Sequence, residues 1–220
     1  ESHKRKIPLI HFSTDYVFGG QGNGPFTPSS KKYPINEYGK SKSLGEDAVL
    51  LENNFSLVIR VASVFGYFGD DFVKTMTKLI LTQENIKVIS DNKISMSFAS
   101  DFSENFLRIL NLFYKEQLIN KNGQNILHFV SPGFTNWFDV AQIIKDEILN
   151  FDINLPVAKI LAINSNEWLS DAKRPIDSRL EIDNDSLGKY DIQLSSWETA
   201  VRKVVNRCLP SIINEVTNEK

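Results

Sequence analysis

Two side chains able to transfer a proton, Tyr38 and Lys42, lie four residues apart in the sequence. In a helix this spacing places both on one face, so a phenol and an ammonium can share a pocket. Upstream, an apolar run ends in Ser13, Thr14 and Asp15. Strands buried in parallel sheets are continuously apolar, and polar groups gather at their carboxyl ends. We therefore expect the Thr14 hydroxyl to reach the same site as Tyr38 and Lys42.

The chemistry that such a trio supports is the reduction of a carbonyl group. Hydride addition to a ketone leaves negative charge on its oxygen, which requires a proton donor and a hydrogen-bond donor beside it. Tyr38 would give the proton, because the Lys42 ammonium favours the anion of a neighbouring phenol. Thr14 would donate a hydrogen bond to the carbonyl oxygen, and Ser13 is a second candidate for that role. Without the neighbouring strands, a Tyr-Lys pair at this spacing is equally typical of an ordinary solvated helix face.

The elements around the trio alternate between strand and helix. Residues 7–13 and 56–61 indicate buried strands that are apolar throughout, and a helix from about residue 37 to 53, capped by Asn36, lies between them. Strand, helix and strand in this order form a βαβ unit. Further helices are predicted at about 72–81, 101–114, 137–149 and from 195 onward, and further strands at 86–89, 126–130 and 157–163.

Two further predictions concern the helix that carries Tyr38 and the glycine-rich segment that precedes it. Leu44, Ala48 and Leu51 are expected to form the apolar stripe of the helix that carries Tyr38. The glycine-rich segment 19–24 follows a strand, but it lacks the Gly-x-Gly-x-x-Gly pattern and leads into prolines. Because a phosphate cradle also needs a helix amino terminus, we predict a loop there.

Composition excludes several function classes. The formal net charge of -2 lacks the basic footprint of a nucleic-acid binder, and no apolar run reaches membrane-spanning length. Cys208 is the only cysteine, which rules out an internal disulfide and favours a reducing, cytoplasmic location. The three histidines are scattered and form no zinc-binding pattern. We expect a cytoplasmic protein with no metal site and neither nucleic acid nor membrane as a partner.

Five motifs occur in a fixed order along nearly the whole chain. They are Ser13-Thr14-Asp15-Tyr16-Val17-Phe18, Asn36-x-Tyr38-Gly39-Lys40-Ser41-Lys42-x-x-Gly45-Glu46, Asp71-Phe72-Val73-Lys74-Thr75-Met76, His128-Phe129-Val130-Ser131-x-Gly133 and Arg174-Pro175-x-x-Ser178-x-Leu180. The series resembles the extended short-chain dehydrogenase/reductase family, and within it most closely the dTDP-4-dehydrorhamnose reductases. Motifs in a shared order are far more specific than any one of them.

The resemblance implies an α/β fold: the carboxyl-terminal part of a Rossmann-like parallel sheet plus a small α/β substrate domain, with the first strands and the Gly-rich turn missing. Residues 1–66 with about 98–130 would form an incomplete dinucleotide-binding domain, and about 67–97 and 131–220 would mainly form the substrate-binding domain. On the order of 80 to 90 residues would precede Glu1 in the parent protein. We therefore expect the 220 residues alone to bind NAD(P)H poorly and to be inactive.

The implied activity is NAD(P)H-dependent reduction of the 4-keto group of a nucleotide-linked 6-deoxysugar in dTDP-rhamnose biosynthesis. The resemblance assigns catalysis to Thr14, Tyr38 and Lys42, and binding of the cofactor, NADPH or NADH, to Ser13, Tyr38 and Lys42. It assigns contacts with the nucleotide-sugar substrate to Thr14, Asp15, Tyr16, Ser63, Val64 and Arg174. Homodimerisation is left open.

Departures from the family pattern leave alternatives open. Ser63 stands where the family has a tryptophan, and residues 91–97 lose a typical Gly and Pro. Asp71 stands where an Asn is common, so a compensating charge from Lys74, Lys93 or Arg174 is expected. One alternative is a reductase of a different nucleotide sugar. The other is a non-catalytic NAD(P)-binding regulatory subunit resembling the methionine adenosyltransferase β subunit, since fold alone does not decide function.

Overall fold

The computed structural model describes residues 1–5, 7–53, 55–116, 125–151, 153, 155–182, 187 and 192–218. The chain divides into two compact units. The first unit comprises Glu1–Ala62, Asp101–Val130 and Ser170–Leu194, and the second comprises Ser63–Ser100, Ser131–Leu169 and Ser195–Lys220. The chain therefore passes between the units several times, and parts of the predicted domain ranges lie outside the described residues.

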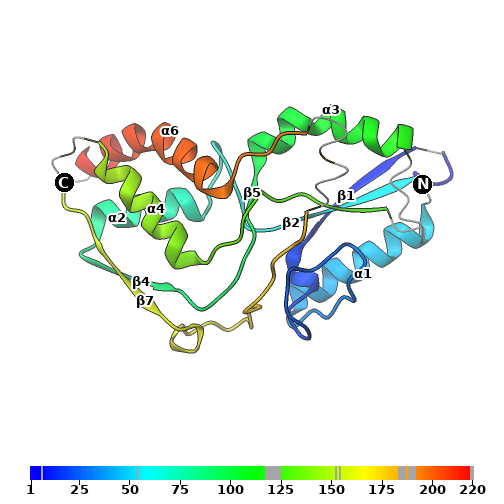
Figure 1. Cartoon of the computed structure of the whole chain (residues 1–220), viewed down its shortest axis with the longest axis horizontal. Coiled ribbons are helices and arrows are strands. Elements are labelled where there is room, and N and C mark those ends of the chain that lie inside the picture. The colour runs from blue at the N-terminus through cyan, green and yellow to red at the C-terminus, as the bar shows by residue number, and fades with distance from the viewer. Residues whose placement is uncertain are drawn as a thin grey trace. The chain divides into compact units, whose positions relative to one another are not determined.

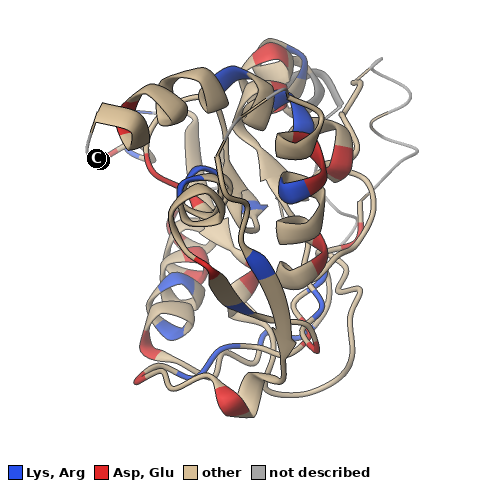
Figure 2. Cartoon of the chain, turned by 90° about the vertical axis from the view of Figure 1, so that its left-hand side faces the viewer, with Lys and Arg blue, Asp and Glu red and all other residues tan. Residues whose placement is uncertain are grey.

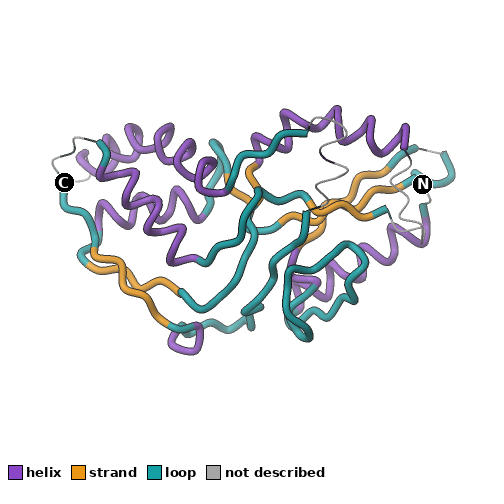
Figure 3. Tube along the Cα trace, in the orientation of Figure 1, coloured by secondary structure: helices purple, strands orange, loops and turns teal. Residues whose placement is uncertain are grey.

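The first unit is built on a parallel three-stranded sheet in the order β1-β2-β6. Its strands are β1 (Leu9–Thr14), β2 (Ser56–Val61) and β6 (Ile126–His128), and its helices are α1 (Glu37–Glu52) and α3 (Ala99–Glu116). Helix α1 connects β1 to β2, which is the predicted βαβ unit. Figures 1 and 3 show α1 on one face of this sheet and α3 on the other. The prediction of a Rossmann-like α/β fold with parallel strands is confirmed.

The two faces of this sheet differ in chemistry. Side chains alternate between the faces along a strand, so Leu57 and Ile59 of β2 pack in one apolar cluster with Ile109 of α3. Arg60 points to the opposite face, where it bonds to a residue of α1. The prediction that strand 56–61 is apolar throughout is therefore wrong at Arg60, which is only 1% exposed.

Helix α1 fully buries no large apolar side chain; Val49 and Leu50 are only half-buried. It begins as predicted, with the Asn36 side-chain oxygen accepting a hydrogen bond from the Gly39 amide at 2.7 Å. The predicted stripe, however, faces outward: Leu44 and Leu51 are 69% and 80% exposed. The buried residues of α1 are Gly39 and Glu46. The stripe prediction is wrong because the sheet face beneath α1 presents polar partners.

The second unit packs helices α2, α4 and α6 around one apolar core (Figure 1). Its elements are β3 (Val64–Phe65), α2 (Phe72–Thr82), β4 (Asn85–Ile89), β5 (Ser97–Phe98), α4 (Trp137–Leu149), β7 (Lys159–Ile163) and α6 (Trp197–Asn218). Strands β4 and β7 pair in parallel, as do β3 and β5. Side chains from all three helices, such as Ile80, Ile144 and Val204, are fully buried.

The charge of Asp71 is compensated within the second unit. Asp71 caps α2, since its Oδ1 accepts a hydrogen bond from the Lys74 amide at 3.1 Å. The Lys74 ammonium forms an ion pair with the same carboxylate and donates to the Gly66 carbonyl at 2.7 Å. Of the compensating charges that the sequence offered, Lys74 is therefore one that pairs with Asp71.

Segment Ser170–Leu194 lies with the first unit, although residues 131–220 were assigned mainly to the substrate-binding domain. Long-range contacts explain this: Phe26 pairs with Leu180 in a parallel bridge, and Ile192 packs in the cluster that contains Leu57. The ligand that each unit binds remains a prediction.

Charge is distributed without a single-sign face on the side shown in Figure 2, where acidic and basic residues are interspersed along the helices. Among the described residues, no helix combines the length and apolarity needed to cross a membrane. The same part of the chain holds no group of three or more His, Cys, Asp and Glu side chains arranged to bind a metal ion.

Candidate active site

Thr14, Tyr38 and Lys42 lie around the carboxyl end of β1. The Lys42 Nζ donates a hydrogen bond to the Phe12 carbonyl at 3.1 Å. The Tyr38 ring makes an edge contact with the ring of Tyr16, with centroids 5.9 Å apart. The Tyr16 amide in turn donates to the Thr14 Oγ1 at 3.2 Å. The structure thus brings the three predicted catalytic residues to one end of the strand.

A close backbone contact fixes the start of α1 against the 3-10 turn η1 (Asp15–Val17) that follows β1. A Cβ atom at Gly39 would lie only 2.1 Å from the Tyr16 carbonyl oxygen, so only glycine permits this approach. The Asn36 side-chain Nδ2 also donates to the Lys173 carbonyl at 2.8 Å. Tyr38 lies between these two anchors and is 53% exposed, which leaves its phenol accessible to a ligand.

Asp15 lies behind Thr14 and is 3% exposed. The Thr14 hydroxyl donates to its Oδ1 at 2.9 Å, and the Ser178 hydroxyl donates to its Oδ2 at 2.6 Å. Burial raises the pKa of Asp15 to about 6, although the hydrogen bonds from Ser178 and Thr14 act to lower it. Ser178 was not predicted as a site residue, but its place in the Arg174-Pro175-x-x-Ser178 motif was the available signal.

Tyr16 and Arg174, two of the predicted substrate contacts, lie within electrostatic reach of each other. Burial raises the pKa of Tyr16, the Asp15 carboxylate raises it further, and the Arg174 guanidinium acts to lower it. Arg174 is exposed. Together they place a phenol and a cation near Tyr38.

The remaining predicted site residues are Ser13, Ser63 and Val64. Ser13 is buried and lies opposite Arg60 in the register of β1 and β2, beneath α1. Ser63 and Val64 belong to the second unit. Ser63 has a φ of 42°, in the left-handed region that non-glycine residues rarely adopt, and Val64 begins β3 and is exposed.

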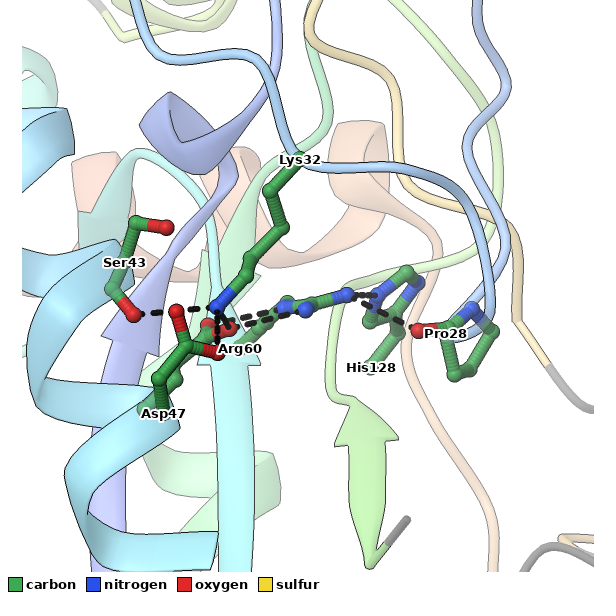
Figure 4. Close-up of polar contacts among 7 residues, drawn as sticks. Pro28, Lys32, Ser43, Asp47, Arg60 and His128 are labelled. Carbon is green, nitrogen blue, oxygen red and sulfur yellow. Dashed lines mark hydrogen bonds and ion pairs between the residues drawn. The ribbon is translucent and has the colours of Figure 1, made fainter. Parts of the chain in front are cut away.

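A buried polar network, absent from the sequence-based site, lies between α1 and the sheet (Figure 4). The Arg60 Nε and Nη2 donate to the two carboxylate oxygens of Glu46, each at 2.8 Å. The Arg60 Nη1 donates to the Pro28 carbonyl at 3.2 Å. The Lys32 ammonium lies 3.2 Å from the Glu46 carboxylate and donates to Asp47 at 2.6 Å. Burial acts to raise the pKa of Glu46, but the hydrogen bonds and charge of Arg60 hold it below its usual value.

His128 closes this network in its neutral form. Because an arginine can only donate, the contact of 3.2 Å between Arg60 Nη1 and His128 Nε2 makes Nε2 the acceptor. The Nδ1 then carries the hydrogen and donates to the Glu181 carbonyl at 3.1 Å. Burial lowers the pKa of His128 to about 3, and the positive charge of Arg60 contributes in the same direction.

The donors at the β1 end fit the ribose hydroxyls of a nicotinamide cofactor. The Lys42 ammonium has three donors, and the Phe12 carbonyl takes one of them. The glycine-rich loop is arranged differently: the Gly24 amide donates to Asp177 at 3.1 Å, and the Gly24 carbonyl accepts from Arg179 at 2.6 Å. The Gly24 backbone groups are thus occupied by side chains of the protein. In the described structure, the loop does not lead into the amino terminus of a helix.

A parallel α/β sheet, with Thr14 at a strand end and Tyr38 and Lys42 on the next helix, defines a protein of the extended short-chain dehydrogenase/reductase type. Residues 1–209 match the family described as RmlD substrate binding domain, so the chain belongs to that family. The predicted resemblance is thereby confirmed.

Similar proteins agree with this assignment. The chain is 30% identical over 203 residues to the spore coat polysaccharide biosynthesis protein SpsK of Bacillus subtilis, covering 92% of this chain and 65% of that protein. It is 29% identical over 202 residues to dTDP-4-dehydrorhamnose reductase of Escherichia coli K12, covering 90% of this chain and 64% of the reductase. The chain thus spans somewhat less than two thirds of the length of these curated relatives.

Solved structures show the same fold. A dTDP-4-dehydrorhamnose reductase from Bacillus anthracis in complex with NADP matches with a TM-score of 0.77 and 26% identity, covering 92% of this chain and 66% of that one. A Clostridium acetobutylicum orthologue matches with a TM-score of 0.75 and 25% identity, covering 93% and 67%. A dTDP-glucose 4,6-dehydratase from Bacillus anthracis, at 15% identity and a TM-score of 0.66, covers 94% of this chain and 64% of its own, and it shares the fold alone.

Proposed function

We propose that the protein containing this chain reduces the 4-keto group of a nucleotide-linked 6-deoxysugar with NADPH or NADH, as in dTDP-rhamnose biosynthesis. The observation that carries the proposal is the grouping of Thr14, Tyr38 and Lys42 at the carboxyl end of β1. The similarity to dTDP-4-dehydrorhamnose reductases over about nine tenths of the chain supports the substrate class.

The side chains divide the work of the reaction. When bound, NAD(P)H would supply the hydride that adds to the C4 carbon, leaving NAD(P)⁺. Tyr38 gives its phenol proton to the carbonyl oxygen, which becomes the product hydroxyl, and a proton from solvent restores the phenol. Lys42 stabilises the phenolate electrostatically and offers its free donors to the ribose. Thr14 donates a hydrogen bond to the oxygen as negative charge develops on it.

The nucleotide portion needs cationic partners. Arg174 is an exposed guanidinium near Tyr16, so it is proposed to bind the diphosphate. Tyr16, Ser63 and Val64 are proposed to contact the sugar or the base. Asp15 is proposed to influence the substrate through its hydrogen bond with Thr14. The single cysteine, Cys208, supports a cytoplasmic location for this reaction.

Tyr38→Phe in the whole gene product tests the proposal. The loss of the phenol proton should lower kcat for a dTDP-4-keto-6-deoxysugar by about 10²- to 10⁴-fold, because a general acid contributes that much. Substrate binding measured by calorimetry should be retained. Tyr33→Phe, which removes the hydroxyl of another exposed tyrosine of the first unit that has no proposed role in catalysis or binding, is the matched control and should leave kcat unchanged.

The same experiment separates an enzyme from a regulatory subunit. A non-catalytic NAD(P)-binding subunit would show no turnover in the wild type, and Tyr38→Phe would leave its partner's activity unchanged. Turnover that persists at the wild-type rate in Tyr38→Phe would remove Tyr38 from the mechanism.

A further inference from the structure

We infer that Asp15 is a positioning residue whose protonation decides whether the Thr14 hydroxyl donates to Asp15 or to the substrate carbonyl. The inference rests on the proposed function, because it assumes that Thr14 serves a carbonyl oxygen. It goes beyond that function by giving the buried carboxylate a task that requires no contact with the substrate.

The hydrogen-bond capacity of Thr14 carries the argument. A hydroxyl has one hydrogen to donate and two lone pairs that accept. One lone pair accepts from the Tyr16 amide at 3.2 Å, and the hydrogen is given to the Asp15 Oδ1 at 2.9 Å. An ionised carboxylate can only accept, so in this arrangement Thr14 has no hydrogen left for a carbonyl oxygen.

Protonation of Asp15 reverses the direction of that bond. The carboxylic acid then donates its hydrogen to the second lone pair of the Thr14 Oγ1, and the hydroxyl hydrogen is released toward the substrate. No covalent bond to carbon changes, and the proton stays on Asp15. The developing oxyanion gains a donor, whereas an ionised Asp15 would both withhold the hydrogen and add a repelling charge.

The surroundings of Asp15 favour and oppose its ionisation in comparable measure. The Ser178 hydroxyl, from a segment 163 residues away, donates to Oδ2 at 2.6 Å and stabilises the ionised form. The backbone amides of Asp15 and Tyr16 also stabilise the ionised form. The nearest titratable group is the Tyr16 phenol, on which the Asp15 carboxylate, Arg174 and Tyr38 all act. Burial opposes ionisation and raises the pKa of Asp15 to about 6, so both forms are accessible under ordinary conditions.

The test is the pH dependence of kcat/KM in the whole gene product, with NADPH and the 4-keto sugar nucleotide, from about pH 5 to about pH 9. In the wild type, kcat/KM should fall about tenfold per pH unit above the pKa of Asp15. Asp15→Asn keeps a neutral donor beside Thr14 at every pH, so its profile should lose that fall. An Asp15→Asn profile that falls in parallel with the wild type would overturn the inference, as would a folded variant inactive at all pH values.

Ser178→Ala gives a second test, in which the fall in kcat/KM should shift along the pH axis and not disappear. Removal of this donor leaves an ionised Asp15 less stabilised, so the fall in kcat/KM should move to higher pH and the variant should exceed the wild type near neutral pH. A purely structural role for Ser178 would instead lower activity at every pH. Ser56→Ala removes a buried hydroxyl at the start of β2, far along the sheet from Thr14, and should leave the fall where it is.

Carbon-13 NMR of the Asp15 carboxyl makes this test independent of turnover. Its titration midpoint should lie near 6 in the wild type and rise in both Ser178→Ala and Thr14→Val, because each substitution removes a hydrogen-bond donor to the ionised form. If the wild type reduces no 4-keto sugar nucleotide, the proposed function fails, while these midpoints still decide whether the residues are coupled. Unchanged midpoints in both variants would overturn the inference.

Discussion

Glu46 and Arg60 form a two-pronged ion pair inside the first unit, with both contacts at 2.8 Å and with exposed fractions of 0% and 1%. Glu46 is on the same helix as Tyr38 and Lys42, one turn after the latter. Because α1 fully buries no large apolar side chain, this pair and the contact at Gly39 contribute strongly to how the helix lies on the sheet. The register of the candidate catalytic residues therefore depends on buried polar geometry.

Breaking this pair should strongly destabilise the protein. Glu46→Leu alone leaves the buried Arg60 without its carboxylate, which costs about 3–5 kcal/mol. Arg60→Met should cost less, because the Lys32 ammonium stays 3.2 Å from the Glu46 carboxylate. The double variant should recover most of that stability, since an apolar pair of similar volume is often neutral. Urea unfolding measures the free energies. Glu37→Gln, which breaks the exposed pair with Lys40, is the control and should cost less than about 1 kcal/mol. Single-variant costs as small as the control would contradict the prediction.

The activity of the double variant shows whether the ion pair also positions α1, and with it Tyr38 and Lys42, in addition to stabilising the fold. If the ion pair aligns α1, the Glu46→Leu/Arg60→Met protein should fold and yet show a lower kcat, because Tyr38 and Lys42 are displaced from the end of β1. Full activity in a stable double variant would show that the contact at Gly39 suffices.

Two glycines of α1 make a matched pair of substitutions. Gly39→Ala would put a Cβ atom 2.1 Å from the Tyr16 carbonyl oxygen, so either α1 or η1 must shift, with a loss of stability and of turnover. Gly45→Ala meets only the His11 imidazole at 3.4 Å, and alanine in a helix is favoured over glycine by about 1 kcal/mol. Thermal unfolding should therefore show a lower Tm for Gly39→Ala and an equal or higher Tm for Gly45→Ala. Equal effects would refute the close-contact argument.

The sequence predicted those parts of the fold that local signals encode. The Asn36 cap and the bounds of α4 follow from side chains next to the helix ends, and the structure has them as predicted. The two-residue strands β3 and β5 were missed, because so short a pairing leaves no periodic pattern.

Hydrogen-bond partners that lie far apart in the sequence could not be predicted from local sequence patterns. Nothing local shows that Arg60 bonds to Glu46 on the preceding helix, or that Ser178 reaches Asp15 from 163 residues away. The apolar stripe on α1 failed for the same reason, because periodicity identifies a face but not what lies opposite it. The grouping of Thr14, Tyr38 and Lys42 was predictable, since strand-end chemistry and helix spacing are local.

The cap of α2 tests whether the acid at position 71 matters for stability. Asp71→Asn keeps the acceptor for the Lys74 amide and loses the ion pair, so it should cost less than Asp71→Ala. Asp71→Ala loses the cap as well and should cost about 0.5–2 kcal/mol. Urea unfolding distinguishes the two. Equal losses would show that the charge, and not the cap, carries the stabilisation.

Acid should destabilise the first unit through His128. The pKa of its buried imidazole is about 3, below the ordinary value of 6.5, so its contribution to stability is fully present above pH 6.5 and is lost as pH falls toward 3. Over that range the residue should remove up to about 1.4 kcal/mol per pH unit, since a proton cannot be added while Arg60 donates to Nε2. His128→Gln, which stays neutral, should be less stable at pH 7 but lose less stability on acidification. His3→Gln, an exposed control, should follow the wild type. Urea unfolding at stepped pH values measures both slopes, and parallel slopes for the wild type and His128→Gln would show that another group titrates.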